Sequence, residues 1–284
     1  TGARCLPTVR VAGLLTLSAA VLCAAVVAGA VITLALSAAG LMPVVGQPAL
    51  SGQPFTTVAP DLALATRESL VIATASTLLA AVIGLGAAIV VLSSTPGAKA
   101  LAALAAAPIP IAHIVAAASF ALLLSDAGLF NRLSTVDTSS WPSLVAGPWP
   151  IGSVAAFAWK ESAFVALVIS AAIGPRLRAY SETAALLGAN SWQRITRVFI
   201  PLALPSLLGA CIIVFLYTVG SYEVVWLLGR AYPEPLPVTA YRLFTSVDLQ
   251  ARPQAAAVAL VSVGLALAAA AATVPLLRRL GVAR

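Results

Sequence analysis

The chain has 284 residues, of which 61% are hydrophobic and 9% are charged, and its formal net charge is +7. Soluble domains carry about 25% charged residues, so this chain lacks the polar surface of a water-facing globule. Its basic residues are scattered along the sequence rather than gathered in one patch, which excludes a nucleic-acid-binding surface.

Six apolar stretches are long enough to cross a hydrocarbon core about 30 Å thick, which needs roughly 20 helical residues. Backbone groups in lipid must be paired within their own segment, so stretches of this length are predicted to be helices. An all-α polytopic membrane protein, with one transmembrane domain over residues 1–284, is therefore expected. The predicted spans are residues 11–38, 69–92, 101–124, 151–173, 207–228 and 254–277.

The first apolar stretch, residues 11–38, exceeds the 7–15 residues of a signal-peptide core, so we expect a retained helix. Cytoplasmic loops of membrane proteins are rich in Lys and Arg. With the N-terminus in the cytoplasm, the inner segments carry ten such residues, the outer loops five, and Lys160 lies within a span. Both termini are therefore predicted to be cytoplasmic.

The third span contains Pro108 and Pro110, which are expected to kink its helix. It also contains His113, the single histidine of the chain. A buried histidine that makes one hydrogen bond between helices is the favoured interpretation, and a ligand-binding role is the alternative.

The fourth span contains two adjacent charges, Lys160 and Glu161. Lys160 lies roughly 14 Å from the outer end of the span, at 1.5 Å per residue, and thus near the bilayer centre. A charge there costs at least ~2.5–3.5 kcal/mol on insertion scales, so it should face the bundle interior or water. Adjacent helix positions point about 100° apart, so the two residues are not expected to pair with each other. Two roles stay open, the translocation path or its gate, and a salt bridge between helices.

Glu223 lies near the outer end of the fifth span, between Tyr222 and Trp226. One interpretation is that Glu223 and Tyr222 contact a hydroxylated or cationic substrate in a translocation path. The other is that the carboxylate reaches the membrane interface.

The loop at residues 174–206 is the one sizeable inner segment. Its Ala- and Leu-rich part, residues 180–187, favours helix, and Gly188 suits a tight C-terminal turn. Asn190, with a Gln three residues later, fits the capping box of a second helix. Pro201 then marks the return into the membrane. A cytoplasmic helix-turn-helix is predicted, with an ordinary basic loop as the alternative.

The same loop resembles the EAA loop of the permease subunits of binding-protein-dependent type I ABC importers. That pattern is EAA, three residues, Gly, nine residues and I-x-L-P. Glu182, Thr183 and Ala184 stand for EAA, Gly188 is in register, and VFIP ending at Pro201 stands for I-x-L-P. The resemblance implies that these five residues belong to a coupling helix between spans four and five, which docks on a cytoplasmic ATPase.

The resemblance further implies a second permease subunit, identical or homologous, and an extracytoplasmic substrate-binding protein. It implies two cytoplasmic nucleotide-binding subunits that bind ATP and Mg, in the inner (plasma) membrane of a prokaryote. The chain itself has no P-loop and is not expected to be an enzyme. No catalytic or metal-binding residues are predicted, since Cys5, Cys23 and Cys211 lack metal-ligand spacing.

The segments GSYEVVWLLG and YPEPLPVTAYRLF resemble permeases of polyamine, iron and phosphonate importers, whereas WKESAF at Lys160 resembles a run shared with sugar permeases. The expected substrate is a small polar solute, that is a sugar, a polyamine, an iron complex or a phosphonate. The alternative function is a stand-alone secondary transporter or channel, for which the sequence shows neither an inverted repeat nor paired broken helices.

Overall fold

The computed structural model describes residues 6–93, 97–134, 137 and 140–279. Within these residues the elements are helices, and no β-strand is present. Six segments are long and apolar enough to cross a membrane, which confirms the prediction of an all-α, multi-pass membrane protein. Cys5, one of the three cysteines, lies outside the described residues. The six segments are Thr16–Ala38, Gln53–Val91, His113–Leu133, Ile151–Leu186, Ser191–Gly220 and Leu249–Thr273.

The chain forms two compact units, and the prediction of a single domain stays a prediction. The first unit comprises Thr1–Pro60 with Ala240–Val261, and the second comprises Asp61–Thr239 with Ser262–Arg284. In the first unit, Ala38 at the end of α1 (Leu6–Ala38) packs against Ala256 and Ala257 near the start of α11 (Arg252–Arg279). Small side chains allow two membrane helices to approach closely.

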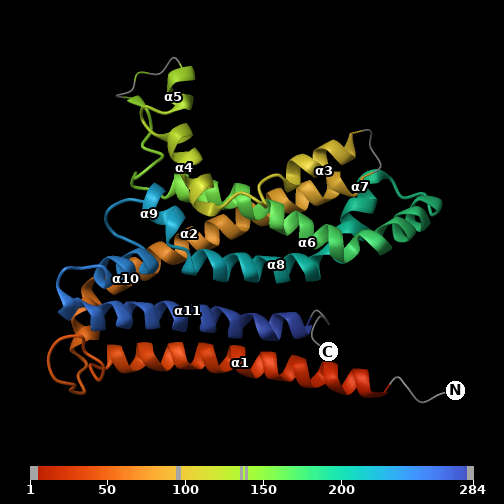
Figure 1. Cartoon of the computed structure of the whole chain (residues 1–284). Helices are drawn as coiled ribbons and strands as arrows, with labels where there is room; N and C mark the ends of the chain where they lie inside the picture. Colours follow the sequence, from red (N-terminus) through yellow and green to blue (C-terminus); the bar gives the residue numbers. More distant parts are fainter. Residues whose placement is uncertain (1–5, 94–96, 135–136, 138–139, 280–284) are drawn as a thin grey trace. The chain divides into compact units, whose positions relative to one another are not determined.

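The second unit is organised around α6 (Ile151–Leu186), which lies along α8 (Ile200–Gly220) (Figure 1). On another face, α2 (Gln53–Val91) approaches α6 so closely that only glycine fits at the contact. A Cβ atom at Gly84 would lie 2.6 Å from the Cβ of Val165. The close packing of these two helices therefore depends on glycine at position 84.

The third predicted span is not one kinked helix. It is divided into α3 (Ala98–Ala106) and α4 (His113–Leu124), with a non-helical stretch between them. Two prolines in that stretch, Pro108 and Pro110, lack an N–H, and in a continuous helix each ring would clash with the carbonyl four residues earlier. The pair therefore breaks the helix, and the expectation of a kink was wrong.

The fifth predicted span is also divided. The helix α8 begins earlier than expected and ends at Gly220, and α9 (Glu223–Leu228) starts after a break. Ser221 has an extended backbone, with ψ 129°, and ends the helix directly after Gly220, a residue of low helix propensity. Glu223 thus begins a separate short helix rather than lying within a span.

Two other helices are longer than their apolar windows. The helix α2 starts at Gln53, and α6 continues to Leu186, past Pro175, although the predicted spans covered 69–92 and 151–173. An apolar window marks the hydrocarbon crossing and not the helix ends, since polar residues continue a helix in the interface. The remaining elements are α5 (Leu129–Leu133), α7 (Ser191–Arg194), η2 (Ile195–Phe199), α10 (Leu236–Phe244) and η3 (Leu249–Ala251).

Candidate functional site

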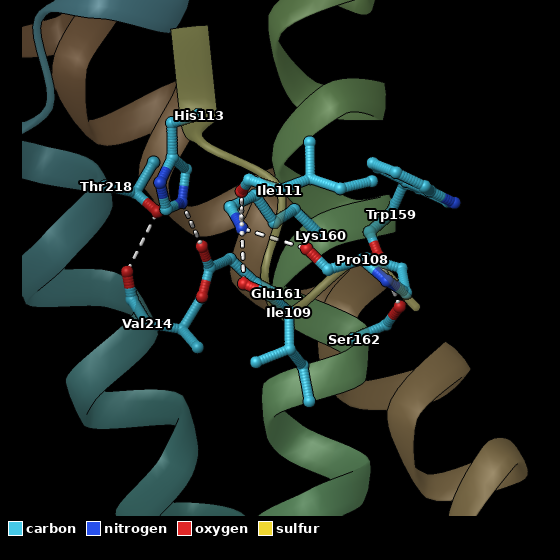
Figure 2. Close-up of polar contacts among 10 residues, drawn as sticks. All are labelled: Pro108, Ile109, Ile111, His113, Trp159, Lys160, Glu161, Ser162, Val214 and Thr218. Atoms are coloured by element: carbon cyan, nitrogen blue, oxygen red, sulfur yellow. Dashed lines mark hydrogen bonds and ion pairs between the residues drawn. The ribbon is translucent and has the colours of Figure 1, made fainter. Parts of the chain in front are cut away.

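Lys160, on α6, points into the break between α3 and α4 (Figure 2). Its Nζ atom donates to the carbonyl oxygens of Pro108, Ile109 and Ile111, at 3.1, 3.3 and 2.5 Å. The side chain is 7% exposed. An ammonium group has three N–H donors, so these three carbonyls use all of them. Lys160 is therefore paired with backbone oxygens rather than with a carboxylate.

This arrangement has a direct physical cause in the sequence. The prolines that end α3 leave carbonyl oxygens without helical partners, and an unpaired carbonyl in a buried site costs about 1–3 kcal/mol. One buried ammonium group donates to three carbonyls of the break, those of Ile109 and Ile111 and that of Pro108, which also accepts from the N–H of Ile111. The free-energy cost of placing a charge in the membrane is offset by the hydrogen bonds that the ammonium group donates to the broken helix.

Glu161, the neighbour of Lys160, faces a different element. Its Oε1 lies 2.9 Å from Nε2 of His113 at the start of α4, and its side chain is 11% exposed. The pair joins α6 to α4 and confirms the bond between helices that was predicted for His113, although its side chain is 24% exposed rather than buried. The ring of His113 also lies 4.7 Å from that of Tyr217 on α8, centre to centre.

Glu223 lies at the exposed start of α9, close to the same group. The Tyr217 hydroxyl is within electrostatic range of both Glu161 and Glu223, and it bonds to the side chain of Ser221 in the second break. We call His113, Lys160, Glu161, Tyr217 and Glu223 the helix-break cluster. Two broken helices thus meet one continuous helix at a polar cluster, an arrangement that transporters use for binding sites.

The predicted turn in the inner loop is present in detail. Gly188 has φ +84°, and its N–H donates to the carbonyl of Ala185, while Ala189 donates to that of Ala184. These two bonds form a Schellman motif, for which glycine is favoured because it adopts positive φ without strain. Asn190 and Gln193 form the predicted capping box, with bonds of 2.8 and 2.9 Å.

The two limbs of this turn are the end of α6 and the helix formed by α7 and η2, which continues into α8. Three large apolar side chains at the turn are exposed: Leu186 at 89%, Leu187 at 84% and Trp192 at 71%. Glu182 is also exposed and pairs with Arg178, one turn earlier on α6, at 3.0 Å. An exposed pair of this kind contributes little to stability.

A polar cavity of about 480 Å³ lies at the base of the turn, lined by Ser93, Ser181, Glu182 and Arg194 among others. Arg194 connects the two limbs, since its guanidinium group lies 3.4 Å from the hydroxyl of Ser181. The turn is therefore held by backbone motifs and by this bridge, while its apolar tip is free.

The predicted site residues fall into two groups. The coupling residues Glu182, Thr183, Ala184 and Gly188 share the turn, and Pro201 lies in the first turn of α8. Of the four predicted path residues, Lys160, Glu161 and Glu223 belong to the helix-break cluster. The fourth, Tyr222, directly precedes α9 without a side-chain capping bond, and its ring stacks on that of Trp226, 6.0 Å away from centre to centre.

Tyr217 and the carbonyls of the first break were not predicted. One signal was available for the carbonyls, because a Pro-x-Pro pair inside an apolar span needs a donor from elsewhere. Among the described residues, no group of three or more His, Cys, Asp or Glu residues could hold a metal ion.

No protein-family model matches the chain. Three curated relatives share parts of it. The molybdenum transport system permease protein ModB of Azotobacter vinelandii is 35% identical over 74 residues, 26% of this chain and 33% of the relative. The spermidine/putrescine permease PotB of Haemophilus influenzae is 44% identical over 50 residues, 18% of each chain. The inner membrane ABC transporter permease YnjC of Escherichia coli is 27% identical over 205 residues, 71% of this chain and 38% of the relative.

The chain therefore spans between about a fifth and two fifths of the length of these relatives. Among solved structures, a bacterial transporter that imports alginate matches with a TM-score of 0.71 and 22% identity over 87% of this chain and 88% of that one. An alginate transporter in complex with its pentasaccharide-bound periplasmic protein matches with a TM-score of 0.72 and 19% identity over 94% of this chain and 95% of that one. An amino acid ABC transporter matches with a TM-score of 0.58 and 20% identity over 81% of this chain and 99% of that one.

These matches show that the chain has the fold found in ABC importers. The resemblance drawn from the inner loop is confirmed at this level, because the relatives are named as ABC or transport permeases rather than as enzymes. The solutes in their names differ, and include molybdenum, spermidine, putrescine and alginate.

Proposed function

We propose that this chain is the membrane-spanning subunit of a binding-protein-dependent, ATP-driven importer. In this role it forms part of the translocation path, and ATP hydrolysis is carried out by a separate subunit. The proposal combines the fold, the names of the relatives and the geometry of the inner turn.

The observation that carries the proposal is the exposed apolar tip of that turn. Leu186, Leu187 and Trp192 project from a turn that is made rigid by the Schellman motif and the capping box. Apolar groups gathered on a water-facing surface mark a contact with another protein. A rigid turn with an apolar tip suits a contact that must transmit a movement, and the proposed partner is a cytoplasmic ATPase.

The proposed assembly has two permease subunits, identical or homologous, and two nucleotide-binding subunits that hold ATP and Mg. An extracytoplasmic binding protein delivers the solute, as the periplasmic protein bound to one structural neighbour suggests. The turn at Glu182–Pro201 then faces the cytoplasm together with both termini, in the inner membrane of a prokaryote. Closure of the ATPases moves the turns and opens the path to the outside.

The helix-break cluster is the proposed part of this chain that borders the path, together with Tyr222. Charged groups within membrane spans face a bundle interior or a water-filled cavity. Lys160 also binds the backbone of the first break, and Glu161 also bonds to His113. Both residues therefore fix the shape of this side of the path. Glu223 is the member that remains free to meet a solute.

A stand-alone secondary transporter or channel is the alternative function. The absence of broken helices no longer argues against it, because the structure contains two breaks, before α4 and before α9. The exposed tip at Leu186, Leu187 and Trp192 favours the importer, since a stand-alone transporter needs no such contact.

A crosslinking experiment tests the proposed contact. A photoreactive amino acid at Trp192 should crosslink to a nucleotide-binding subunit in native membranes. The control is the same amino acid at Leu133, which is similarly exposed but lies in α5, far along the chain from the turn. No ATPase crosslink from position 192, in a chain that is correctly inserted, would contradict the proposal.

A further inference from the structure

The charges of the helix-break cluster divide into those that are satisfied within the protein and those that are not. The ammonium group of Lys160 makes three bonds, to the carbonyls of Pro108, Ile109 and Ile111. It therefore has no N–H left to offer an anion. The predicted path residues include one cation, Lys160, and two acids, Glu161 and Glu223, so the sequence alone does not decide whether the path prefers cations or anions. The structure shows that the cation is already bound within the protein.

The carboxylates of Glu161 and Glu223 retain oxygens that accept no hydrogen bond within the described part of the chain. Glu161 engages His113 through one oxygen, Oε1. Glu223 is exposed and makes no hydrogen bond or ion pair within the described part of the chain. Both act on the hydroxyl of Tyr217, which is itself partly exposed. A carboxylate that faced lipid would be costly, so Glu223 must face water or a solute.

The exposed face of α9 adds aromatic surface to this carboxylate. Glu223 and Trp226 are three residues apart and lie on the same side of the helix, whereas Val224, Val225 and Leu228 form its buried side. The ring of Tyr222 stacks on Trp226. A carboxylate beside stacked aromatic rings is suited to bind a cation by charge and by cation–π attraction.

We infer that the solute passing this cluster is an amine-bearing cation. The inference rests on the proposed importer function and names the class of solute for the same path. An anion would meet Glu161 and Glu223 and find the one ammonium group of the cluster fully occupied. An ammonium group would instead meet a free carboxylate, the Tyr217 hydroxyl and the ring of Trp226.

The test uses the whole importer, purified from native membranes with its ATPase and binding protein and reconstituted in liposomes. ATP-dependent uptake is measured for putrescine and ethanolamine as amine cations, molybdate as an anion, and maltotriose as a neutral solute. The variant Glu223→Gln removes one charge and keeps the shape of the side chain. The matched control, Asp126→Asn, makes the same change at an exposed carboxylate in the segment between α4 and α5.

The expected result is uptake of at least one of the two amines. In Glu223→Gln the half-saturating amine concentration should rise about tenfold, as expected for losing one bond to a charged group, and in Asp126→Asn it should not change. Uptake of neither amine, or amine uptake that is unaffected by Glu223→Gln, would overturn the inference. Uptake of molybdate or maltotriose without either amine would overturn it too, and would leave the importer function standing. Failure of that function would show separately, as a complex without an ATPase.

Discussion

The ammonium group of Lys160 lies 2.5 Å from the carbonyl oxygen of Ile111, a residue 49 positions earlier in the chain. This contact joins the first third of α6 to the end of a break caused by prolines. A charged side chain and an irregular backbone are each unfavourable in a membrane, and here each supplies what the other lacks. The same lysine thus fixes the position at which α4 begins and, with it, the position of His113.

The first prediction concerns this lysine. Lys160→Met keeps length and apolar bulk but removes the ammonium donor from three carbonyls, of which that of Pro108 retains the N–H of Ile111, so the free energy of unfolding should fall by about 2–4 kcal/mol. Titration with SDS, followed by tryptophan fluorescence, measures it. Lys99→Met is the matched control, since Lys99 is exposed and should be nearly neutral. Equal stability of the two variants would show that Lys160 does not hold the break.

The second prediction concerns Glu161 and His113. A double-mutant cycle with Glu161→Gln and His113→Ala should give a coupling free energy of about 1.5–3 kcal/mol, because the bond involves a charged acceptor and is largely buried. The same SDS titration supplies the four unfolding free energies. Additivity within about 0.5 kcal/mol would mean that the two side chains do not interact in the membrane.

The third prediction concerns the contact between α2 and α6. In Gly84→Ala the new Cβ would lie 2.6 Å from the Cβ of Val165 and 2.8 Å from the carbonyl oxygen of Ser162. The helices must then separate, at a cost of about 1–3 kcal/mol in stability. Gly86→Ala has no neighbour within 4 Å and should be neutral or slightly stabilising. Thermal unfolding of both variants in one detergent decides the question, and equal loss in both would contradict this packing.

The fourth prediction concerns the inner turn. Gly188 has positive φ, so Gly188→Val should strain the turn by about 1–2 kcal/mol, although no atom blocks a side chain there. Asn tolerates this conformation, which makes Gly188→Asn the matched control. We expect the Val variant to fold but to hydrolyse more ATP per solute imported, and the Asn variant to resemble the wild type. A Val variant that hydrolyses no more ATP per solute than the wild type would show that the turn does not couple ATP hydrolysis to transport.

Local features of this chain were predictable from its sequence. The capping box of Asn190 and Gln193, the positive φ of Gly188 and the existence of six apolar crossings each depend on residues close together in the chain. Such features are set by local backbone preferences and by hydrophobicity, which act without knowledge of the fold.

Features that depend on distant contacts were not predictable in the same way. The proximity of the two helix breaks, the use of Lys160 by three carbonyls and the position of Tyr217 beside His113 all require α4, α6 and α8 to be packed first. The predicted spans did not include the two helix breaks, because the mean hydropathy of a long window hardly changes over the six or two residues at which each helix is interrupted. The close approach at Gly84 leaves no mark in the sequence beyond one glycine among many.

The most direct test of the importer function is to isolate the tagged chain from its native membrane and measure its bound subunits together with its ATP-dependent uptake. We predict that the wild type retains a nucleotide-binding subunit, and that Leu187→Glu, which places a charge at the apolar tip, releases that subunit and abolishes uptake while the chain stays inserted. A stable complex that transports solute without any ATPase would contradict the proposed function.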